Sequence, residues 1–360
     1  MNLATLGWNP FFDQHFSPFR SQGLAPARVV REHGQSYQVL SERGELSARV
    51  AGRLLRGTPM SSDLPVVGDW VAIQARPDEG KGTIHAILPR KSRFSRKVTR
   101  SKSEEQIVAA NVDTVFLMSG LDADFNTRRI ERYLALAWDS GADPVIVLNK
   151  TDVCADVERC VAEVESVAFG VPIHPVSAKE MRGLDALRRY LLPGQTIALL
   201  GSSGVGKSTL LNRLLGAERQ ATASVRESDC KGRHVTSHRE LVLLPGGGMI
   251  IDNPGMRELQ MWAHEEVLAG TFQDVEELAA RCRFSDCLHD SEPGCAIREA
   301  LANRVLDPAR LRSYHRLQRE IRHMEARRAE KARLGERAKK RQREKRNRGR
   351  QLPKAKGWIE

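Results

Sequence analysis

The segment that most restricts the possible folds of this chain is GSSGVGKS at residues 201–208. It follows the apolar run TIALL and precedes TLLNRLLG, a run with helical periodicity. A glycine-rich turn between a buried strand and a helix directs backbone N–H groups toward the oxygen atoms of a phosphate. Because a parallel α/β sheet supplies this strand–turn–helix unit, the segment predicts an α/β domain with a phosphate-binding loop.

Each position of this loop has an expected role in holding a nucleotide. The glycines let backbone N–H groups turn toward the phosphates, Lys207 reaches the β- and γ-phosphates, and the Ser208 hydroxyl is a ligand for magnesium. We therefore expect the phosphates to be bound by Gly201, Ser202, Ser203, Gly204, Val205, Gly206, Lys207, Ser208 and Thr209.

Two further segments predict which base is bound. NKTD at residues 149–152 ends the apolar run DPVIVL, and the Asp152 carboxylate can accept two parallel hydrogen bonds from the N1–H and exocyclic amine of guanine. Adenine has no such donor pair. SAK at residues 177–179 also follows an apolar run, where the N–H of Ala178 can meet the guanine O6. The predicted guanine site comprises Asn149, which supports the loop and contacts N7, with Lys150, Thr151, Asp152, Ser177, Ala178 and Lys179.

The segment DNPG at residues 252–255 follows the apolar run GMII and completes the expected triphosphate site. Asp252 can hold magnesium through water, and Gly255 can offer its N–H to the γ-phosphate. Upstream of it, Thr236 is the candidate switch threonine on magnesium, with an ordinary loop threonine as an equal alternative. Together the motifs predict GTP with magnesium as the ligand.

The residue after DNPG bears on hydrolysis. It is Met256, where many GTPases have a glutamine that orients the attacking water. Because a thioether is a poor hydrogen-bond partner for water, either another side chain takes this role or a partner completes the site. His234 is the candidate catalytic residue, and a histidine that is merely exposed to solvent is the alternative.

The order of these motifs along the chain is unusual. An ordinary GTPase has the phosphate-binding loop first and the guanine-specifying motif last, whereas here the order is NKTD, SAK, GSSGVGKS, Thr236 and DNPG. A parallel sheet tolerates relocated termini when these lie close together at the surface. The order predicts a circularly permuted GTPase domain, in which the segment after DNPG connects the switch directly to a C-terminal module.

A metal site is predicted in that module. Four residues with the spacing C-x4-C-x-H-x5-C are Cys282, Cys287, His289 and Cys295. Four nitrogen and sulfur ligands with no open position indicate one structural zinc ion rather than a catalytic one, and they argue against a zinc hydrolase. The remaining cysteines, Cys154, Cys160 and Cys230, are expected to be ordinary thiols.

Positive charge is concentrated near the C-terminal end. The net charge of the chain is +12, but residues 307–360 hold 20 lysines and arginines against 7 acidic residues, so the first 306 residues carry a net charge of −1. Clustered basic side chains favour a polyanionic partner, nucleic acid before membrane. The apolar runs are far shorter than the ~20 residues of a transmembrane helix, and the first residues lack the pattern of a secretory signal. We expect no membrane partner.

The remaining sequence indicates how the chain is organised. Short β-type runs between residues 26 and 90 predict a small antiparallel barrel, with a sandwich as the alternative. The basic stretch 89–106 breaks this pattern and indicates a linker or an exposed strap that faces RNA. In the tail, a recurrence every three or four residues predicts a helix packed by one face, with the apolar residues Leu311, Tyr314, Leu317, Ile321 and Met324.

Taken together, the motifs resemble one known family, the circularly permuted GTPases called RsgA, YjeQ or EngC, which depend on the small ribosomal subunit. The resemblance rests on VVGDWV at 66–71, AANVDTVFLM at 109–118, NKTD, SAK, GSSGVGKST, KGRHVTSHREL, DNPGMREL and the cysteine–histidine cluster. It implies a multidomain α/β protein with an N-terminal OB-fold barrel, a circularly permuted P-loop GTPase domain and a C-terminal zinc-binding domain with a basic helical tail. It also implies a catalytic histidine at the position of His234.

The expected regions follow from the motifs and this resemblance. They are an N-terminal extension at 1–25, an RNA-binding barrel at 26–98, the permuted GTPase domain at 99–275, a zinc-binding domain with a helix at 276–325, and a basic tail at 326–360.

The expected function is that of a monomeric cytoplasmic GTPase that binds the small ribosomal subunit and its rRNA, assists late maturation, and hydrolyses GTP to GDP when stimulated by the subunit. One alternative is an RNA-binding assembly factor or RNA chaperone in which GTP only tunes affinity. Another is a permuted GTPase that acts on the large subunit, which the barrel and the zinc motif disfavour.

Overall fold

The computed structural model describes residues 2–34, 36–57, 64–97, 105–216, 239–252, 271–290, 292–308, 310–319 and 321–322, with residues 326 and 333. The strands are β1 (Ala25–His33), β2 (Ser36–Ser41), β3 (Gly44–Val50), β4 (Trp70–Arg76), β5 (Lys81–Ile87), β6 (Arg93–Lys97), β7 (Glu105–Ala110), β8 (Thr114–Gly120), β9 (Asp143–Asn149), β10 (Ile173–Pro175), β11 (Thr196–Gly201), β12 (Glu240–Leu243) and β13 (Met249–Asp252). The helices are η1 (Leu3–Leu6), α1 (Pro10–Arg20), α2 (Gly52–Gly57), η3 (Pro77–Glu79), α3 (Thr127–Ser140), α4 (Val157–Glu165), η4 (Leu184–Tyr190), α5 (Lys207–Leu215), α7 (Gln273–Ala279) and α8 (Ala296–Ala302).

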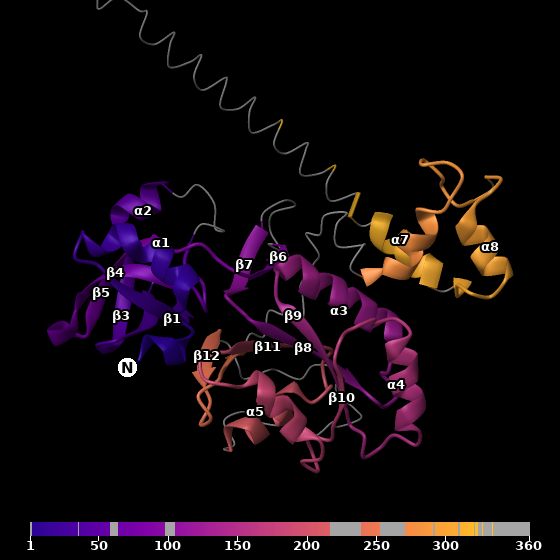
Figure 1. Ribbon diagram of the computed structural model, residues 1–360. Coiled ribbons are helices and arrows are strands. Elements are labelled where there is room, and N and C mark those ends of the chain that lie inside the picture. Colours follow the sequence, from indigo (N-terminus) through magenta and orange to yellow (C-terminus); the bar gives the residue numbers. More distant parts are fainter. Residues whose placement is uncertain are drawn as a thin grey trace, which may run out of the picture.

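The first five strands close into a barrel in the order β1-β2-β3-β5-β4-β1, drawn in indigo and violet in Figure 1. This order, with inward apolar side chains such as Val39 and Ile73, confirms the predicted OB-fold barrel. The expectation of a purely antiparallel barrel was wrong at one pairing, because β3 and β5 run parallel. Helix α2 lies between β3 and β4 in the sequence. Strands β4 and β5 then pair antiparallel, which brings β5 next to β3 with both strands running in the same direction.

Helix α1 and strand β6 are among the elements of this half that the sequence did not predict. Helix α1 packs on the barrel through an aromatic cluster in which Trp8 lies edge-on to Trp70, with ring centroids 4.8 Å apart. The basic stretch expected to be a linker contains β6, which pairs antiparallel with β7. Phe94 of β6 is buried and anchors this strand. The other residues of β6 are polar or charged, so the sequence shows no apolar alternation that would predict a strand.

The second half is an α/β sheet in the order β10-β9-β8-β11-β13-β12, parallel except for β12. All seven residues of β8 and all six of β11 are buried, as their continuous apolar runs predict for strands covered on both faces. Helices α3 and α4 pack on one face in the core cluster that contains Leu117 and Ile146. Helix α5 and the turn η4 pack on the opposite face in the cluster that contains Phe116 and Val147.

The barrel is joined to this sheet rather than tethered by a linker. Strand β1 meets the edge strand β12 at the pair Arg31 and Glu240, whose side chains also form an ion pair. Beside it, Arg28 is 2% exposed and donates hydrogen bonds to the carbonyls of Gly68 and Leu6 in the N-terminal half and to that of Asn111 at the entry to β8. Burial lowers the pKa of Arg28 to about 10, against the raising effect of nearby Asp113 and Asp69. The cation therefore stays charged at neutral pH and holds the two halves together.

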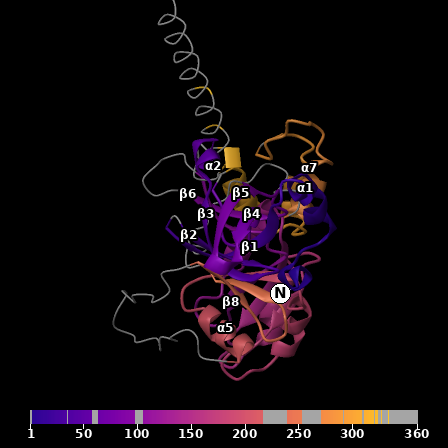
Figure 2. The ribbon, with the colours of Figure 1, turned by 90° about the vertical axis from the view of Figure 1, so that its left-hand side faces the viewer.

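The C-terminal module lies against α3, on the opposite side of the α/β sheet from the barrel (Figure 1). It contains α7, α8 and a helical stretch over residues 310–319 and 321–322, called the C-terminal helix below. The helix buries Tyr314, Leu317 and Ile321, as the apolar spacing predicts, while Met324 lies outside the described residues. Figure 2, turned by 90°, shows α5 on the face of the molecule away from α2 and α7.

Arg310 connects this module to the sheet domain. Its guanidinium donates to Glu131 of α3 at 2.6 Å and to Asp274 of α7 at 2.9 Å, and the side chains of Arg310 and Glu131 are each 5% exposed. A buried, multiply bonded arginine fixes the orientation of the elements that surround it, because each lost bond would leave a polar group unsatisfied. Among the described residues, no helix is long and apolar enough to span a bilayer.

Candidate nucleotide site and metal centre

The sequence motifs meet at one edge of the α/β sheet. Strand β9 ends at Asn149 and β11 ends at Gly201, and both run parallel to β8, which lies between them. The carboxyl ends of parallel strands share one edge, where ligands of such sheets bind. The NKTD segment and the phosphate-binding loop are therefore neighbours in space although about 50 residues separate them in the sequence.

Asn149 connects all three loops of the predicted site. Its Nδ2 donates to the carbonyl of Val205 in the phosphate-binding loop at 2.8 Å, and its Oδ1 accepts from the N–H of Ala178 in the SAK segment at 2.9 Å. The side chain is buried, so both bonds are shielded from water. Because the Ala178 N–H is already engaged, the predicted contact with the guanine O6 would share or replace this bond.

The surroundings of Asp152 favour its ionised form, which the predicted guanine contact would need. The Ser177 hydroxyl donates to Asp152 Oδ1 at 2.6 Å and accepts from the N–H of Glu180 at 3.1 Å. The hydrogen bond from Ser177 lowers the pKa of the Asp152 carboxyl below its ordinary value. The neighbouring Lys150 has a φ of +69° and forms an ion pair with Asp122 at 2.5 Å, which fixes the start of the same loop.

The phosphate-binding loop has the backbone that its glycines predict. Gly206 has a φ of +100°, and a Cβ atom built on it would lie 2.2 Å from Asn149 Nδ2, so no other residue fits there. The Lys207 ammonium donates to the carbonyls of Gly201 at 2.8 Å and Ser202 at 2.5 Å and thus lies across the loop. Ser208 and Thr209 follow in the first turn of α5, both partly exposed.

One residue beside this loop was missed by sequence reasoning. Asp124, in the loop after β8, accepts a hydrogen bond from the Ser202 hydroxyl at 2.6 Å and forms an ion pair with Arg129 of α3 at 2.5 Å. The bond from Arg129 lowers the pKa of Asp124. The available signal was its position four residues after the end of the buried strand β8, whose neighbours β9 and β11 both end in the predicted nucleotide motifs.

The predicted switch and catalytic residues fall largely outside the described structure. This applies to Thr236, His234, Gly255 and Met256. The backbone of Asp252 ends β13, which pairs parallel with β11, so the residue lies at the same sheet edge as the phosphate-binding loop. Nothing further is described of its side chain.

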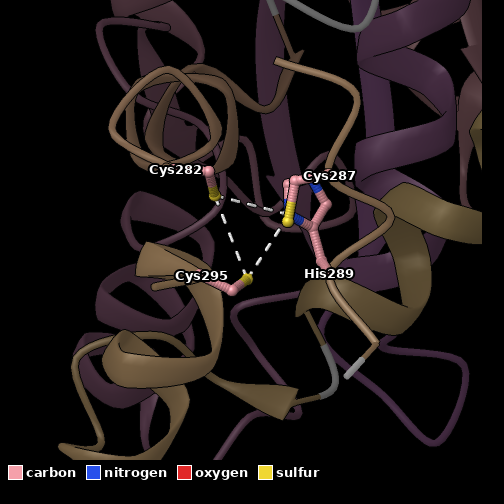
Figure 3. A group of neighbouring side chains, drawn as sticks. All are labelled: Cys282, Cys287, His289 and Cys295. Carbon is pink, nitrogen blue, oxygen red and sulfur yellow. Dashed lines mark hydrogen bonds between the residues drawn. The ribbon is translucent and has the colours of Figure 1, made fainter. Parts of the chain in front are cut away.

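The four predicted metal ligands come together in the C-terminal module (Figure 3). Cys282 Sγ and Cys295 Sγ each lie 3.6 Å from His289 Nδ1 and 3.9 Å from one another, and all four ligand atoms lie within 4.8 Å. Cys154 and Cys160 form a separate pair with sulfur atoms 4.0 Å apart. The cluster of Cys282, Cys287, His289 and Cys295 can hold one metal ion.

Local structure favours the metal-binding forms of Cys282 and His289, whereas burial raises the pKa of the Cys287 thiol to about 11. Cys282 follows α7, and Cys295 is the residue that precedes α8. Burial raises the pKa of the Cys282 thiol, but hydrogen bonds from the N–H groups of Ala296 and Ile297 outweigh it and lower the pKa overall. Burial lowers the pKa of His289, which favours the neutral imidazole that a metal binds. His289 also has a φ of +65°, a conformation that turns the chain between the second and fourth ligands.

Comparison with known sequences gives consistent matches. A protein-family model described as RsgA GTPase matches residues 87–262. A protein of Opitutus terrae named small ribosomal subunit biogenesis GTPase RsgA is 52% identical over 329 residues, which cover 89% of this chain and 90% of that protein. A protein of the same name from Syntrophotalea carbinolica is 50% identical over the same length, again covering 89% of this chain and 90% of its own.

Solved structures agree with these matches. The crystal structure of YjeQ from Thermotoga maritima superposes with a TM-score of 0.62 at 29% identity and covers 83% of this chain and 98% of that one. The structure of YloQ, described as a circularly permuted GTPase, gives a TM-score of 0.60 at 26% identity and covers 83% of this chain and 96% of its own. The similarity extends over barrel and sheet domain together.

Proposed function

This chain belongs to the RsgA GTPase family, and from that premise we propose that it hydrolyses GTP to GDP and phosphate while bound to the small ribosomal subunit, and that hydrolysis releases it during late maturation of the subunit. The observation that carries the proposal is a pair of hydrogen bonds of the Asn149 side chain, which donates to the Val205 carbonyl and accepts from the Ala178 N–H. These bonds hold the base-specifying loops against the phosphate-binding loop, which supports the proposal that one nucleotide contacts all three.

In the proposed complex the guanine lies between the NKTD and SAK segments. Asp152, ionised because of its bond from Ser177, accepts from the N1–H and the exocyclic amine of the base. Lys150, Thr151 and Lys179 line the same two loops. The phosphates lie over the N–H groups of the loop from Gly201 to Gly206, and the Lys207 ammonium exchanges its bonds to two loop carbonyls for phosphate oxygens.

We propose that hydrolysis depends on groups near the γ-phosphate. Magnesium bound with GTP supplies charge neutralisation at the phosphates, and Ser208, Thr236 and Asp252 are the residues that would hold it. The N–H of Gly255 contacts the γ-phosphate, and His234 orients the attacking water in place of the side chain of Met256. Substituting His234 by alanine should abolish stimulated turnover while leaving GDP affinity unchanged, and unchanged turnover would exclude this role.

The metal of the C-terminal module is proposed to be zinc in a structural role. In a tetrahedral zinc site, Zn–S bonds of about 2.3 Å and Zn–N bonds of about 2.0 Å place two sulfurs about 3.8 Å apart and a sulfur about 3.5 Å from the nitrogen. The observed separations of 3.9 Å and 3.6 Å fit this geometry. With four protein ligands no coordination position remains for substrate, so the ion would stabilise the module and take no part in hydrolysis.

We further propose that the protein acts as a monomer in the cytoplasm and binds rRNA through its barrel, its zinc domain and its basic tail at residues 326–360. The experiment that tests the function measures GTP turnover by the purified protein with and without purified small subunits. Turnover that rises with small subunits, and a tenfold excess of ATP that does not compete, would support the proposal. Equal competition by ATP would contradict the guanine site, and no stimulation would contradict the partner.

The second candidate function is an RNA-binding assembly factor in which GTP only tunes affinity. The charge near the C-terminal end favours it, because residues 307–360 carry a net charge of +13 and clustered basic side chains bind polyanions. A protein with His234→Ala that matures subunits normally in cells would favour this candidate. Co-sedimentation with the large rather than the small subunit would indicate the other alternative.

A further inference from the structure

A groove of about 890 Å³ lies between α3 and the C-terminal helix, on the side of the sheet domain that faces the C-terminal module. Arginines line it from both sides, so it differs from the guanine and phosphate sites at the edge of the sheet. Those from α3 are Arg128, Arg129 and Arg132, and those from the C-terminal helix are Arg312, Arg316 and Arg319.

Six arginines outnumber the acidic groups in the described lining of the groove. Glu131 is the one carboxylate among the described lining residues, and it is buried against Arg310 beneath the surface. Arg128, Arg312 and Arg316 are exposed, and within the described part of the chain none of them forms an ion pair with a carboxylate. Of the six lining arginines, Arg129 is paired with Asp124, whereas Arg128, Arg312 and Arg316 present positive charge to solvent with no acidic partner among the described residues.

The spacing of the arginines follows from helix geometry. Arg312 and Arg316 are four residues apart and Arg319 three further, which places them on one face at steps of about 6 Å and 4.5 Å along the helix axis. Arg128 and Arg132 repeat the four-residue step on α3. The two rows are fixed relative to one another because Arg310, next to the groove, bonds both Glu131 of α3 and Asp274 of α7.

We propose that this groove is a docking surface for the ribose–phosphate backbone of RNA, held between the sheet domain and the C-terminal module. The proposal rests on the proposed function and assigns a part of its RNA contact to a surface formed jointly by α3 and the C-terminal helix. Each guanidinium presents a planar fork of N–H donors that matches two phosphate oxygens, and the rows are built on rigid helices.

Two observations favour RNA over an acidic protein segment. The chain continues from the C-terminal helix into residues 326–360, which hold 15 lysines and arginines against 4 acidic residues, so the groove begins a longer basic tract suited to an extended polyanion. Six of the ten polar residues in the lining are moreover arginines. Recognition of a folded acidic protein would instead call for exposed apolar anchors at the centre of the interface, whereas the apolar lining residues Phe272 and Leu317 are 1% and 6% exposed.

The experiment uses the full-length protein and a 20-nucleotide oligouridylate as the probe, titrated by fluorescence anisotropy between 50 and 300 mM salt. The test variant is Arg312→Gln with Arg316→Gln. The matched control is Arg159→Gln with Arg188→Gln, which removes the same charge from side chains that are 70% and 79% exposed and lie outside the groove.

We expect the loss of two phosphate contacts to flatten the slope of log K against log salt by about 1.4, and to weaken binding by roughly 25-fold at 0.1 M salt. The control variant should keep the wild-type slope. A groove variant with the wild-type slope would overturn the inference. So would a decaglutamate peptide that binds the wild-type protein as tightly as the oligouridylate, since the surface would then fit an acidic protein.

The results distinguish a failure of the groove inference from a failure of the proposed function. If small subunits do not stimulate GTP turnover of the wild-type protein, the proposed function fails, whereas the oligouridylate titration needs no turnover. If small subunits stimulate the wild-type protein and the groove variant binds both probe and subunit with unchanged salt dependence, the groove inference alone fails.

Discussion

Replacing Asn149 by alanine should separate the three loops of the nucleotide site. The side chain is 3% exposed and makes two hydrogen bonds, to the Val205 carbonyl and from the Ala178 N–H. Alanine leaves both backbone groups without their partner, at a cost of about 1–3 kcal/mol each. If water relieves part of this cost, about 2 kcal/mol remains, which corresponds to a roughly 30-fold weaker affinity for GDP when the nucleotide must restore the loop arrangement.

Two measurements separate binding from stability. Calorimetric titration of GDP gives the affinity, and urea unfolding without nucleotide gives the free energy of unfolding. The control is Asn9→Ala, which removes a side chain that accepts from the Phe11 N–H at 3.1 Å at the start of α1. That variant should lose about 1 kcal/mol of stability with no change in GDP affinity. An Asn149→Ala protein that binds GDP as tightly as the wild type would refute the reasoning.

Three further predictions concern other parts of the molecule. Arg310→Ala should lower the free energy of unfolding, measured in urea, by about 3–5 kcal/mol, because Glu131 stays buried without this partner. The double variant Arg310→Met with Glu131→Leu should regain most of the lost stability. An Arg310→Ala protein as stable as the wild type would contradict this. Affinity for GDP should stay constant from pH 7 to pH 5, because the lowered pKa keeps Asp152 ionised and the guanine contact is lost only as the pH falls through that pKa; a loss of affinity near pH 6 would oppose it. Elemental analysis should find one zinc ion per chain, and Cys282→Ser should reduce the zinc content and loosen the C-terminal module, as seen by faster proteolysis between α7 and α8.

Local sequence patterns predicted much of the sheet domain. The continuous apolar runs of β8 and β11 indicated buried parallel strands, and the glycine-rich segment indicated the turn between β11 and α5, because both signals arise within a few residues. Likewise, the spacing of the cysteines and the histidine indicated their cluster. These features depend on neighbours in the sequence, so a single sequence suffices to find them.

The features that were missed depend on contacts between distant segments. The buried bonds of Arg28 join positions up to 221 residues away, and Arg310 meets Glu131 across 179 residues. Hydrophobic periodicity along the sequence does not indicate which distant residues pair in this way. The parallel pairing of β3 with β5 depends on how the whole barrel closes, and β6 is a strand because Phe94 finds a buried site. The pair of Asp124 and Ser202 was hidden for the same reason, since the two residues come from different strand ends.

The central claim is that one guanine nucleotide spans the three loops joined by Asn149 and that its hydrolysis responds to the small ribosomal subunit. The most direct measurement is the rate of GTP hydrolysis at saturating GTP with increasing purified small subunits, beside the same titration with large subunits. The account predicts a rate that rises and saturates with small subunits alone. A rate that does not change with small subunits, or that rises equally with large ones, would contradict it.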